Sequence, residues 1–164
     1  RKKAGTPVSR PFLGCLLPRA GETCFQRTTR VSGEEKVLNS TRTIAVVGIS
    51  SKSDRPSYIV ASYLREQGYK MIPVNPAEKE ILGERCYPDL ATVPESVDVV
   101  DIFRRSEKVP PIVEEAIKVG AKVVWMQEGV VNGEAEARAL AAGLQVVMDH
   151  CIMKEHKRYL RQNS

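Results

Sequence analysis

The stretch Thr43-Ile44-Ala45-Val46-Val47-Gly48 is a short apolar run that ends in a glycine. Four more apolar runs follow it, at residues 70–74, 97–103, 122–126 and 144–148. Runs that are rich in β-branched residues and apolar on both faces are typical of parallel strands buried between two layers of helices. The sequence therefore predicts a sheet of about five parallel strands.

Helical periodicity fills the intervals between these runs. Helices are predicted over 57–67, over 106–119, from Asn132 to Gly143 and over 152–160. Gly68 and Gly120 stand where the first two would end, whereas the segment 75–94 contains three prolines and is predicted to be a long loop. The alternation predicts an α/β fold, a Rossmann-like doubly wound sheet in three αβα layers, with strand order 3-2-1-4-5.

The positive charge is concentrated near the N-terminus. The chain of 164 residues carries a formal charge of +5, with 25 Lys and Arg against 20 Asp and Glu. Seven of the basic residues but only one acidic residue precede Ser32, so that segment carries +6 and the remainder −1. Because affinity for nucleic acid comes mainly from neutralising phosphates, a nearly neutral body argues against a nucleic-acid partner.

This charge distribution divides the chain into two parts. Residues 1–39 are predicted to be a basic, disordered extension, and residues 40–164 a single Rossmann-like domain. Two other interpretations of the extension remain open: a transit-type segment, which would direct the protein to a mitochondrion or plastid, and an artefact of the sequence. No apolar run approaches the roughly 18 residues of a membrane span, so a cytoplasmic protein is expected.

Residues that bind metals or carry out catalysis are sparse. The sequence has no Cys-x-x-Cys pair and no His close to a pair of cysteines, so no metal site is predicted. The four cysteines are expected to be reduced, with Cys151 an inert core thiol. His150 and His156 are expected to have structural or surface roles, and no hydrolase motif is present. The sequence predicts no catalytic residue.

The segment after the first run has the strongest binding signal. In doubly wound sheets, ligands bind beyond the carboxyl ends of the strands, beside the first strand. There, residues 48–57 lead into a helix N-terminus, where N–H groups and the helix dipole attract anions. The predicted phosphate-binding residues are Gly48, Ser50, Ser51, Lys52, Arg55, Pro56 and Ser57. The alternative is a solvated polar loop with Ser57 as the helix N-cap.

The ends of the other strands complete the predicted site. The candidates are Asn75 and Pro76 after the second strand, Phe103 and Arg104 after the third, and Gln127 and Gly129 after the fourth. An ordinary dinucleotide site fits poorly, because Ser50 and Ser53 stand where the G-x-G-x-x-G pattern needs glycines. The acid that would bind a ribose hydroxyl after the second strand is also absent. The residues alone predict a phosphate-bearing ligand without identifying it.

Five stretches, in order along the chain, together form a specific pattern. They read T-I-A-V-V-G-I-S-S-K-S-D-R-P-S-Y at 43–58, G-Y-K-M-I-P-V-N-P at 68–76, V-D-V-V-D-I-F-R-R at 97–105, G-A-K-V-V-W-M-Q-E-G-V-V-N at 120–132 and A-G-L-Q-V-V-M-D-H-C at 142–151. Through them the chain resembles the small stand-alone CoA-binding proteins of bacteria and archaea, which are similar to the CoA-binding domain of the succinyl-CoA synthetase α subunit. That enzyme carries its phosphohistidine on a second domain, for which this chain has no room. The resemblance therefore implies CoA binding without the ligase reaction.

The resemblance also implies a role for each part of the site. The 48–57 loop would hold the CoA pyrophosphate, Asn75 and Pro76 would border the adenosine, Phe103 and Arg104 would line the next strand end, and Gln127 to Gly129 would face the pantetheine arm. Glu128 departs from the apolar residue expected in this family, which puts in doubt how the thiol end is held.

The predicted function is binding of coenzyme A or an acyl-CoA by a monomer or weak homodimer that has no evident catalytic residues and no nucleic-acid or membrane partner. Three alternatives of the same fold remain open: an NAD(P)-dependent oxidoreductase, a ligase-subunit fragment that acts with a partner chain, and a metabolite or redox sensor. The missing glycines and the missing acid count against the oxidoreductase, and the absence of a DNA-reading motif counts against the sensor.

Overall fold

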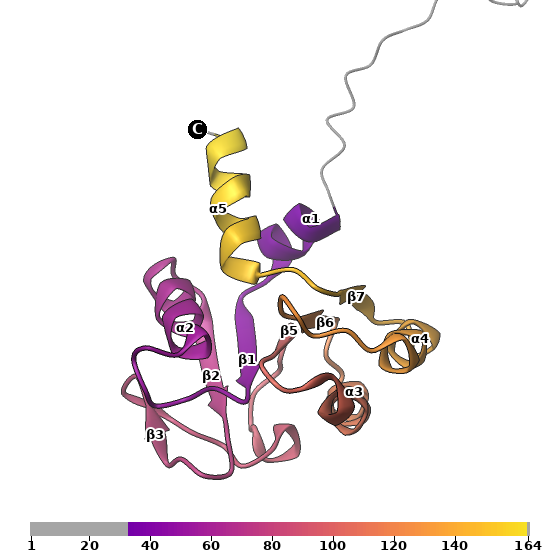
Figure 1. Cartoon of the computed structure of the whole chain (residues 1–164), viewed down its shortest axis with the longest axis horizontal. Coiled ribbons are helices and arrows are strands. Elements are labelled where there is room, and N and C mark those ends of the chain that lie inside the picture. The colour runs from indigo at the N-terminus through magenta and orange to yellow at the C-terminus, as the bar shows by residue number, and fades with distance from the viewer. Residues whose placement is uncertain (1–32, 164) are drawn as a thin grey trace, which may run out of the picture. The chain divides into compact units, whose positions relative to one another are not determined.

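The computed structural model describes residues 33–163 and contains a five-stranded parallel sheet (Figure 1). Its strands are β1 (Thr43–Val47), β2 (Lys70–Val74), β5 (Val99–Ile102), β6 (Val123–Met126) and β7 (Gln145–Val147), in the spatial order β2-β1-β5-β6-β7. All four neighbouring pairs are parallel. The predicted α/β Rossmann-like fold is confirmed, and each strand lies within one of the five apolar runs.

The predicted strand order was wrong. Numbered along the chain, the five strands lie in the order 2-1-3-4-5 rather than 3-2-1-4-5. The connection from β2 to β5 explains the difference, because it has no helix and holds only β3 (Glu80–Ile81), β4 (Glu84–Arg85) and a 3-10 turn at Leu90–Thr92. Leu90 is buried on the face of the sheet opposite the preceding helix. The chain thus crosses to that face, and the next strand is added on the other side of β1.

Helices cover both faces of the sheet and form the three predicted layers (Figure 1). The helices that follow strands are α2 (Pro56–Glu66), α3 (Val109–Lys118), α4 (Gly133–Ala141) and α5 (Ile152–Gln162), and a 3-10 turn at Ser106–Lys108 precedes α3. The buried side chains of α3 and α4 pack with one face of the sheet, and those of α2 and α5 pack with the other. Asn132 caps α4 as predicted, since its side-chain oxygen accepts a hydrogen bond from the Ala135 N–H.

A helix that the sequence did not predict precedes the sheet. Helix α1 (Gly33–Ser40) lies against α5, and its Val37 and Leu38 belong to the same core cluster as α2. It was missed because these two apolar residues are too few to make a helical period. The packed body of the protein therefore begins before residue 40, and the predicted boundary at 39/40 is too late. Residues 1–32, with most of the predicted extension and with Cys15 and Cys24, lie outside the described residues.

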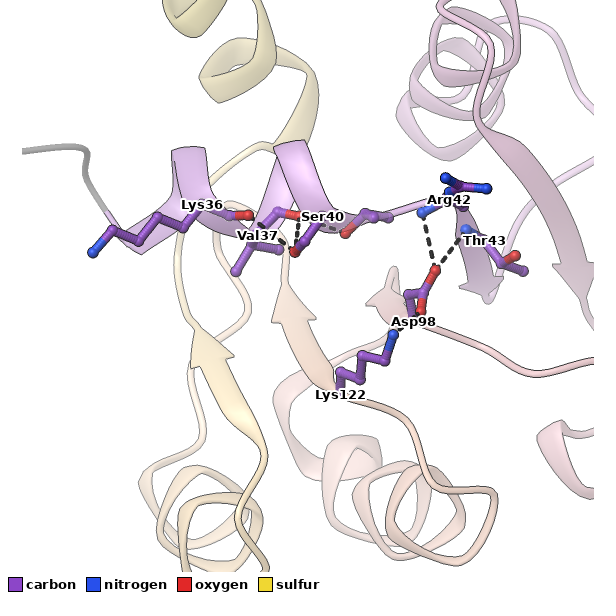
Figure 2. A network of polar contacts seen from close by, with 8 residues as sticks. Lys36, Val37, Ser40, Arg42, Thr43, Asp98 and Lys122 are labelled. Carbon is purple, nitrogen blue, oxygen red and sulfur yellow. Dashed lines mark hydrogen bonds and ion pairs between the residues drawn. The ribbon is translucent and has the colours of Figure 1, made fainter.

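Asp98 joins three elements at the amino ends of the strands (Figure 2). One carboxylate oxygen accepts hydrogen bonds from the Arg42 N–H (2.9 Å) and the Thr43 N–H (3.1 Å), and the other pairs with the Lys122 ammonium at 2.7 Å. Partial burial opposes ionisation of Asp98, but the hydrogen bonds from Lys122 and the two backbone groups outweigh it and lower the pKa of this carboxyl. The contacts fix the connection between α1 and β1 to the start of β5.

The described residues contain neither a membrane-spanning helix nor a cluster of metal ligands. Among residues 33–163, no helix combines the length and the apolar character needed to cross a membrane. Within the same range, no three His, Cys, Asp or Glu residues lie close enough together to hold a metal ion.

Candidate functional site

The loop between β1 and α2 begins with a close approach of two strand ends. Gly48 has a φ of +87°, and its N–H donates to the Val74 carbonyl at 2.9 Å. A side-chain carbon at this position would lie 2.6 Å from the Phe103 carbonyl oxygen and 2.8 Å from Arg104 Nε. Only glycine satisfies both the backbone angle and the space. The end of β1 is thereby held against the residues that follow β5.

Hydrogen bonds within the loop hold it as a compact turn. The Ser57 hydroxyl accepts from the Ser50 N–H at 3.1 Å, and the Ser50 hydroxyl accepts from the Lys52 N–H at 3.2 Å. Helix α2 begins at Pro56 after Arg55, so the alternative in which Ser57 is the N-cap is wrong. Ser57 instead lies in the first turn, where a backbone N–H has no carbonyl partner within the helix. The turn therefore offers N–H and hydroxyl groups beside two cations.

These groups line a cavity of about 430 Å³, here named the loop cavity. Its lining residues are Gly48, Ser50, Lys52, Arg55, Pro56, Ser57 and Phe103. Lys52 and Arg55 are exposed, and neither is in an ion pair with another described residue. The cavity therefore combines two uncompensated cations with a helix N-terminus, which suits a phosphate or pyrophosphate.

A second cavity, the Gln127 cavity, has a volume of about 550 Å³ and shares Pro56 and Phe103 with the first. It is lined by Pro56, Val60, Phe103, Arg104, Arg105, Gln127, Glu128, Val130 and Cys151. The charge of Glu128, the residue that departs from the family pattern, is paired with Lys154 of α5. Cys151, predicted to be an inert core thiol, is half-buried and faces this cavity.

A third cavity, the Pro76 cavity, has a volume of about 240 Å³ and shares Arg104 with the second. It is lined by Val47, Val74, Pro76, Pro88, Asp89, Arg104, Lys108, Ile112 and Glu115. Aliphatic and proline side chains dominate the lining, so the cavity suits a flat, mostly apolar group such as a purine. Phe103 thus joins the loop cavity to the Gln127 cavity, and Arg104 joins the Gln127 cavity to the Pro76 cavity.

The structure brings most of the predicted site residues together. The cavities take in ten of the thirteen, namely Gly48, Ser50, Lys52, Arg55, Pro56, Ser57, Pro76, Phe103, Arg104 and Gln127. The other three line none of these cavities. Ser51 donates its hydroxyl proton to Glu78, Asn75 donates to the Ile49 carbonyl at 2.7 Å, and the Gly129 N–H donates to Asp149. Asn75 therefore supports the loop from the end of β2.

One buried acid near the site was missed. Asp101 of β5 has no exposed surface, and one of its carboxylate oxygens accepts a hydrogen bond from the Gln127 side-chain amide at 2.7 Å. Burial raises the pKa of Asp101 to about 7, against the opposing effect of the Gln127 hydrogen bond. A signal was present in the sequence, since the apolar run 97–103 contains two acids, and Asp101 is the one flanked by two apolar residues on each side.

Comparisons with known proteins show what the chain is similar to in sequence and in fold. A family model described as a CoA binding domain matches residues 42–157. The uncharacterized protein YneT of Bacillus subtilis is 39% identical over 122 residues, which cover 74% of this chain and 90% of that protein. A solved structure of a hypothetical protein from Pyrococcus horikoshii superposes with a TM-score of 0.76 at 44% identity, covering 77% of this chain and 89% of that one. An ADP-forming acetate–CoA ligase of Archaeoglobus fulgidus is 30% identical over 107 residues, which cover 60% of this chain but only 16% of the ligase.

Proposed function

Because this chain belongs to the CoA-binding domain family, we propose that it binds coenzyme A or an acyl-CoA at the carboxyl edge of its sheet. The observation that carries the proposal is the loop cavity, where Lys52 and Arg55 flank the first turn of α2. Two cations and an N-terminal helix turn stabilise a pyrophosphate through charge-assisted hydrogen bonds. The pyrophosphate of CoA is the natural occupant of such a place.

The neighbouring cavities account for the two ends of the ligand. The Pro76 cavity, with its apolar walls and with Arg104 and Lys108 at its border, suits the adenine and the 3′-phosphate. The Gln127 cavity suits the pantetheine arm, because Pro56, Val60, Phe103 and Val130 give it apolar walls and Gln127 adds a group that can form hydrogen bonds. Arg104 lines both of these cavities, and Phe103 lines the Gln127 cavity and the loop cavity. In this arrangement the ligand crosses the end of β5.

Titration calorimetry of the full chain tests the proposal directly. CoA, acetyl-CoA, NAD and NADH are compared at the same pH and salt concentration. We expect CoA or acetyl-CoA to bind, and the affinity to fall as salt is raised, because phosphate contacts are screened. Binding of NADH without binding of either CoA compound would contradict the proposal and favour an oxidoreductase.

The loop is tested by the double variant Lys52→Ala/Arg55→Ala. Loss of two charged hydrogen-bond donors should lower the affinity for CoA at least about tenfold. The melting temperature should change little, since both side chains are exposed. Lys118→Ala/Arg161→Ala is the matched control, because it removes the same charge from exposed positions outside the three cavities. Equal CoA affinity in the two double variants would remove the loop from the binding site.

A further inference from the structure

The geometry of Asp101 differs from that expected of a core residue. In the sheet register it lies between Val46 of β1 and Trp125 of β6, and none of its surface is exposed. Only Oδ1 has a partner, the Gln127 amide; among the described residues, Oδ2 is the one buried side-chain oxygen or nitrogen without a hydrogen bond. A buried carboxylate with a single partner destabilises a fold relative to an aliphatic residue of similar size. Packing alone gives no reason for an acid here.

The partner of Asp101 faces the binding region. Gln127 follows β6, is almost fully buried, and lines the Gln127 cavity with Phe103 and Cys151. A carboxylate can only accept hydrogen bonds, so the amide must turn its NH2 group toward Asp101. The carbonyl oxygen, Oε1, is then directed away from Asp101. This oxygen makes no hydrogen bond with a described residue, and it is not completely buried.

We propose that Asp101 is a positioning residue that fixes the orientation of the Gln127 amide, so that Oε1 accepts a hydrogen bond from the pantetheine arm of the ligand. The donor is either an amide N–H of the arm or the terminal thiol, which have the same donor chemistry. This inference rests on the proposed CoA binding and adds the group that recognises one end of the ligand. Without Asp101, the amide has no fixed orientation and can present NH2 instead.

Protonation of Asp101 provides a way to observe this orientation. A protonated carboxyl group can donate to Gln127 Oε1, which allows the amide to turn over and removes the acceptor from the cavity. Burial raises the pKa of Asp101 to about 7. The two buried titratable groups of the helices on this face have other partners, since His156 of α5 bonds Tyr63 of α2 at 2.8 Å and Glu155 of α5 pairs with Arg158 at 3.0 Å. Nearer the cavity, Arg104, Arg105, Glu128 and Cys151 lie along its lining, and none of them bonds Asp101.

The test compares Asp101→Asn with Gln127→Leu, their double variant, and Asp98→Asn as the matched control. Asp98 undergoes the same chemical change outside all three cavities. CoA affinity is measured by calorimetry at pH 6 and pH 8, together with the melting temperature. At pH 8, Asp101→Asn and Gln127→Leu should each lower the affinity for CoA about fivefold, which corresponds to the loss of one hydrogen bond. The double variant should show no further loss, because both changes remove the same contact.

The pH dependence separates positioning from a structural role. CoA itself titrates between pH 6 and pH 8, and the change in affinity of Asp98→Asn over this range corrects for that. After the correction, wild type should bind CoA more tightly at pH 8 than at pH 6. Asp101→Asn should bind CoA with the same affinity at both pH values. S-methyl-CoA, which lacks the S–H group, identifies the donor. The thiol is the donor if wild type binds S-methyl-CoA about fivefold more weakly than CoA and Asp101→Asn binds the two compounds equally. If S-methyl-CoA binds wild type as CoA does, the amide donates.

Two results would overturn the inference. One is equal CoA affinity in Asp101→Asn and Asp98→Asn at pH 8. The other is a loss of affinity in Asp101→Asn that is the same at both pH values and accompanied by a large fall in melting temperature, which would indicate damage to the fold. Failure of wild type itself to bind CoA would contradict the proposed function rather than the role of Asp101 alone.

Discussion

Asp98 and Asp101 lie three residues apart in the chain, one just before β5 and one within it, yet their surroundings are opposite. Asp98 accepts two backbone hydrogen bonds and pairs with Lys122, and these contacts lower its pKa. Asp101 has one hydrogen bond and a buried oxygen without a partner, and burial raises its pKa. The first aspartate stabilises the fold in its ionised form, whereas ionisation of the second destabilises it.

The same contrast holds for the two ends of the sheet. At the amino ends of the strands, α1 and the Asp98 contacts leave polar groups paired within the chain (Figure 2). At the carboxyl ends, Lys52, Arg55 and Arg104 line open cavities and have no ion pair with a described residue. In the proposed function these unpaired groups contact the ligand. Changes at the amino end should therefore alter stability alone, and changes at the carboxyl end should alter binding.

The largest effect on stability is expected at the amino end, from Leu38→Ala. Leu38 of α1 is 2% exposed and belongs to the core cluster shared with α2. Removing its side chain should lower the free energy of unfolding by about 3 kcal/mol, as for other buried leucines. Urea denaturation measures this loss, and the CoA affinity of the folded variant should equal that of wild type. A weaker CoA affinity in the folded fraction would show that the two ends of the sheet are coupled.

Gly48→Ala should combine the two kinds of effect. The new methyl group would meet the Phe103 carbonyl oxygen at 2.6 Å, in a backbone conformation that disfavours side chains. We expect a loss of roughly 2 to 3 kcal/mol in the free energy of unfolding. CoA affinity should also fall, because the loop between β1 and α2 would move away from Phe103. Ala substitution at Gly133, where a side chain meets nothing within 4 Å, is the control; a Gly48 variant that binds CoA normally would contradict the role of this close approach.

Much of the fold could be predicted because β-branched runs report burial on both faces of a sheet. The strand order could not, since it depends on which face Leu90 packs against, and a single apolar residue in a proline-rich connection does not reveal its side. Helix α1 was missed for a similar reason: Val37 and Leu38 are adjacent in sequence and show no period, although both are buried by α5 and the sheet.

Which candidate residues lie close together could be predicted to the extent that topology alone determines it. The rule that ligands bind beyond the carboxyl ends of parallel strands correctly brought Phe103, Arg104 and Gln127 together. The rule could not predict that the Gly129 N–H donates a hydrogen bond to Asp149, because that bond depends on the path of the chain after β7. Asp101 was overlooked because an acid inside an apolar run was attributed to the strand, although a buried charge in a strand is itself a sign of function.

Asp101→Asn should change how stability depends on pH. The pKa of Asp101 is raised from 3.8 to about 7 in the folded protein, so folding takes up a proton between these values. Wild type then loses stability as the pH rises through this range, by about 2 kcal/mol between pH 5 and pH 7. The variant has no such group and should lack this loss. Denaturation curves at both pH values measure the difference, and parallel pH dependences for wild type and variant would contradict the raised pKa.

Asp98→Asn should show the smaller effect and the opposite dependence on pH. Asparagine keeps an acceptor for the Arg42 and Thr43 N–H groups but loses the charge that pairs with Lys122, so about 1 kcal/mol of stability should be lost at pH 7. The pKa of Asp98 is lowered from 3.8, so its contribution is fully present above that value and is lost as the pH falls through the lowered pKa. The difference between wild type and variant should therefore be constant from pH 5 to pH 8 and shrink in stronger acid. If it grew or shrank between pH 5 and pH 8 as the Asp101 difference does, the two aspartates would not be the independent groups that their contacts indicate.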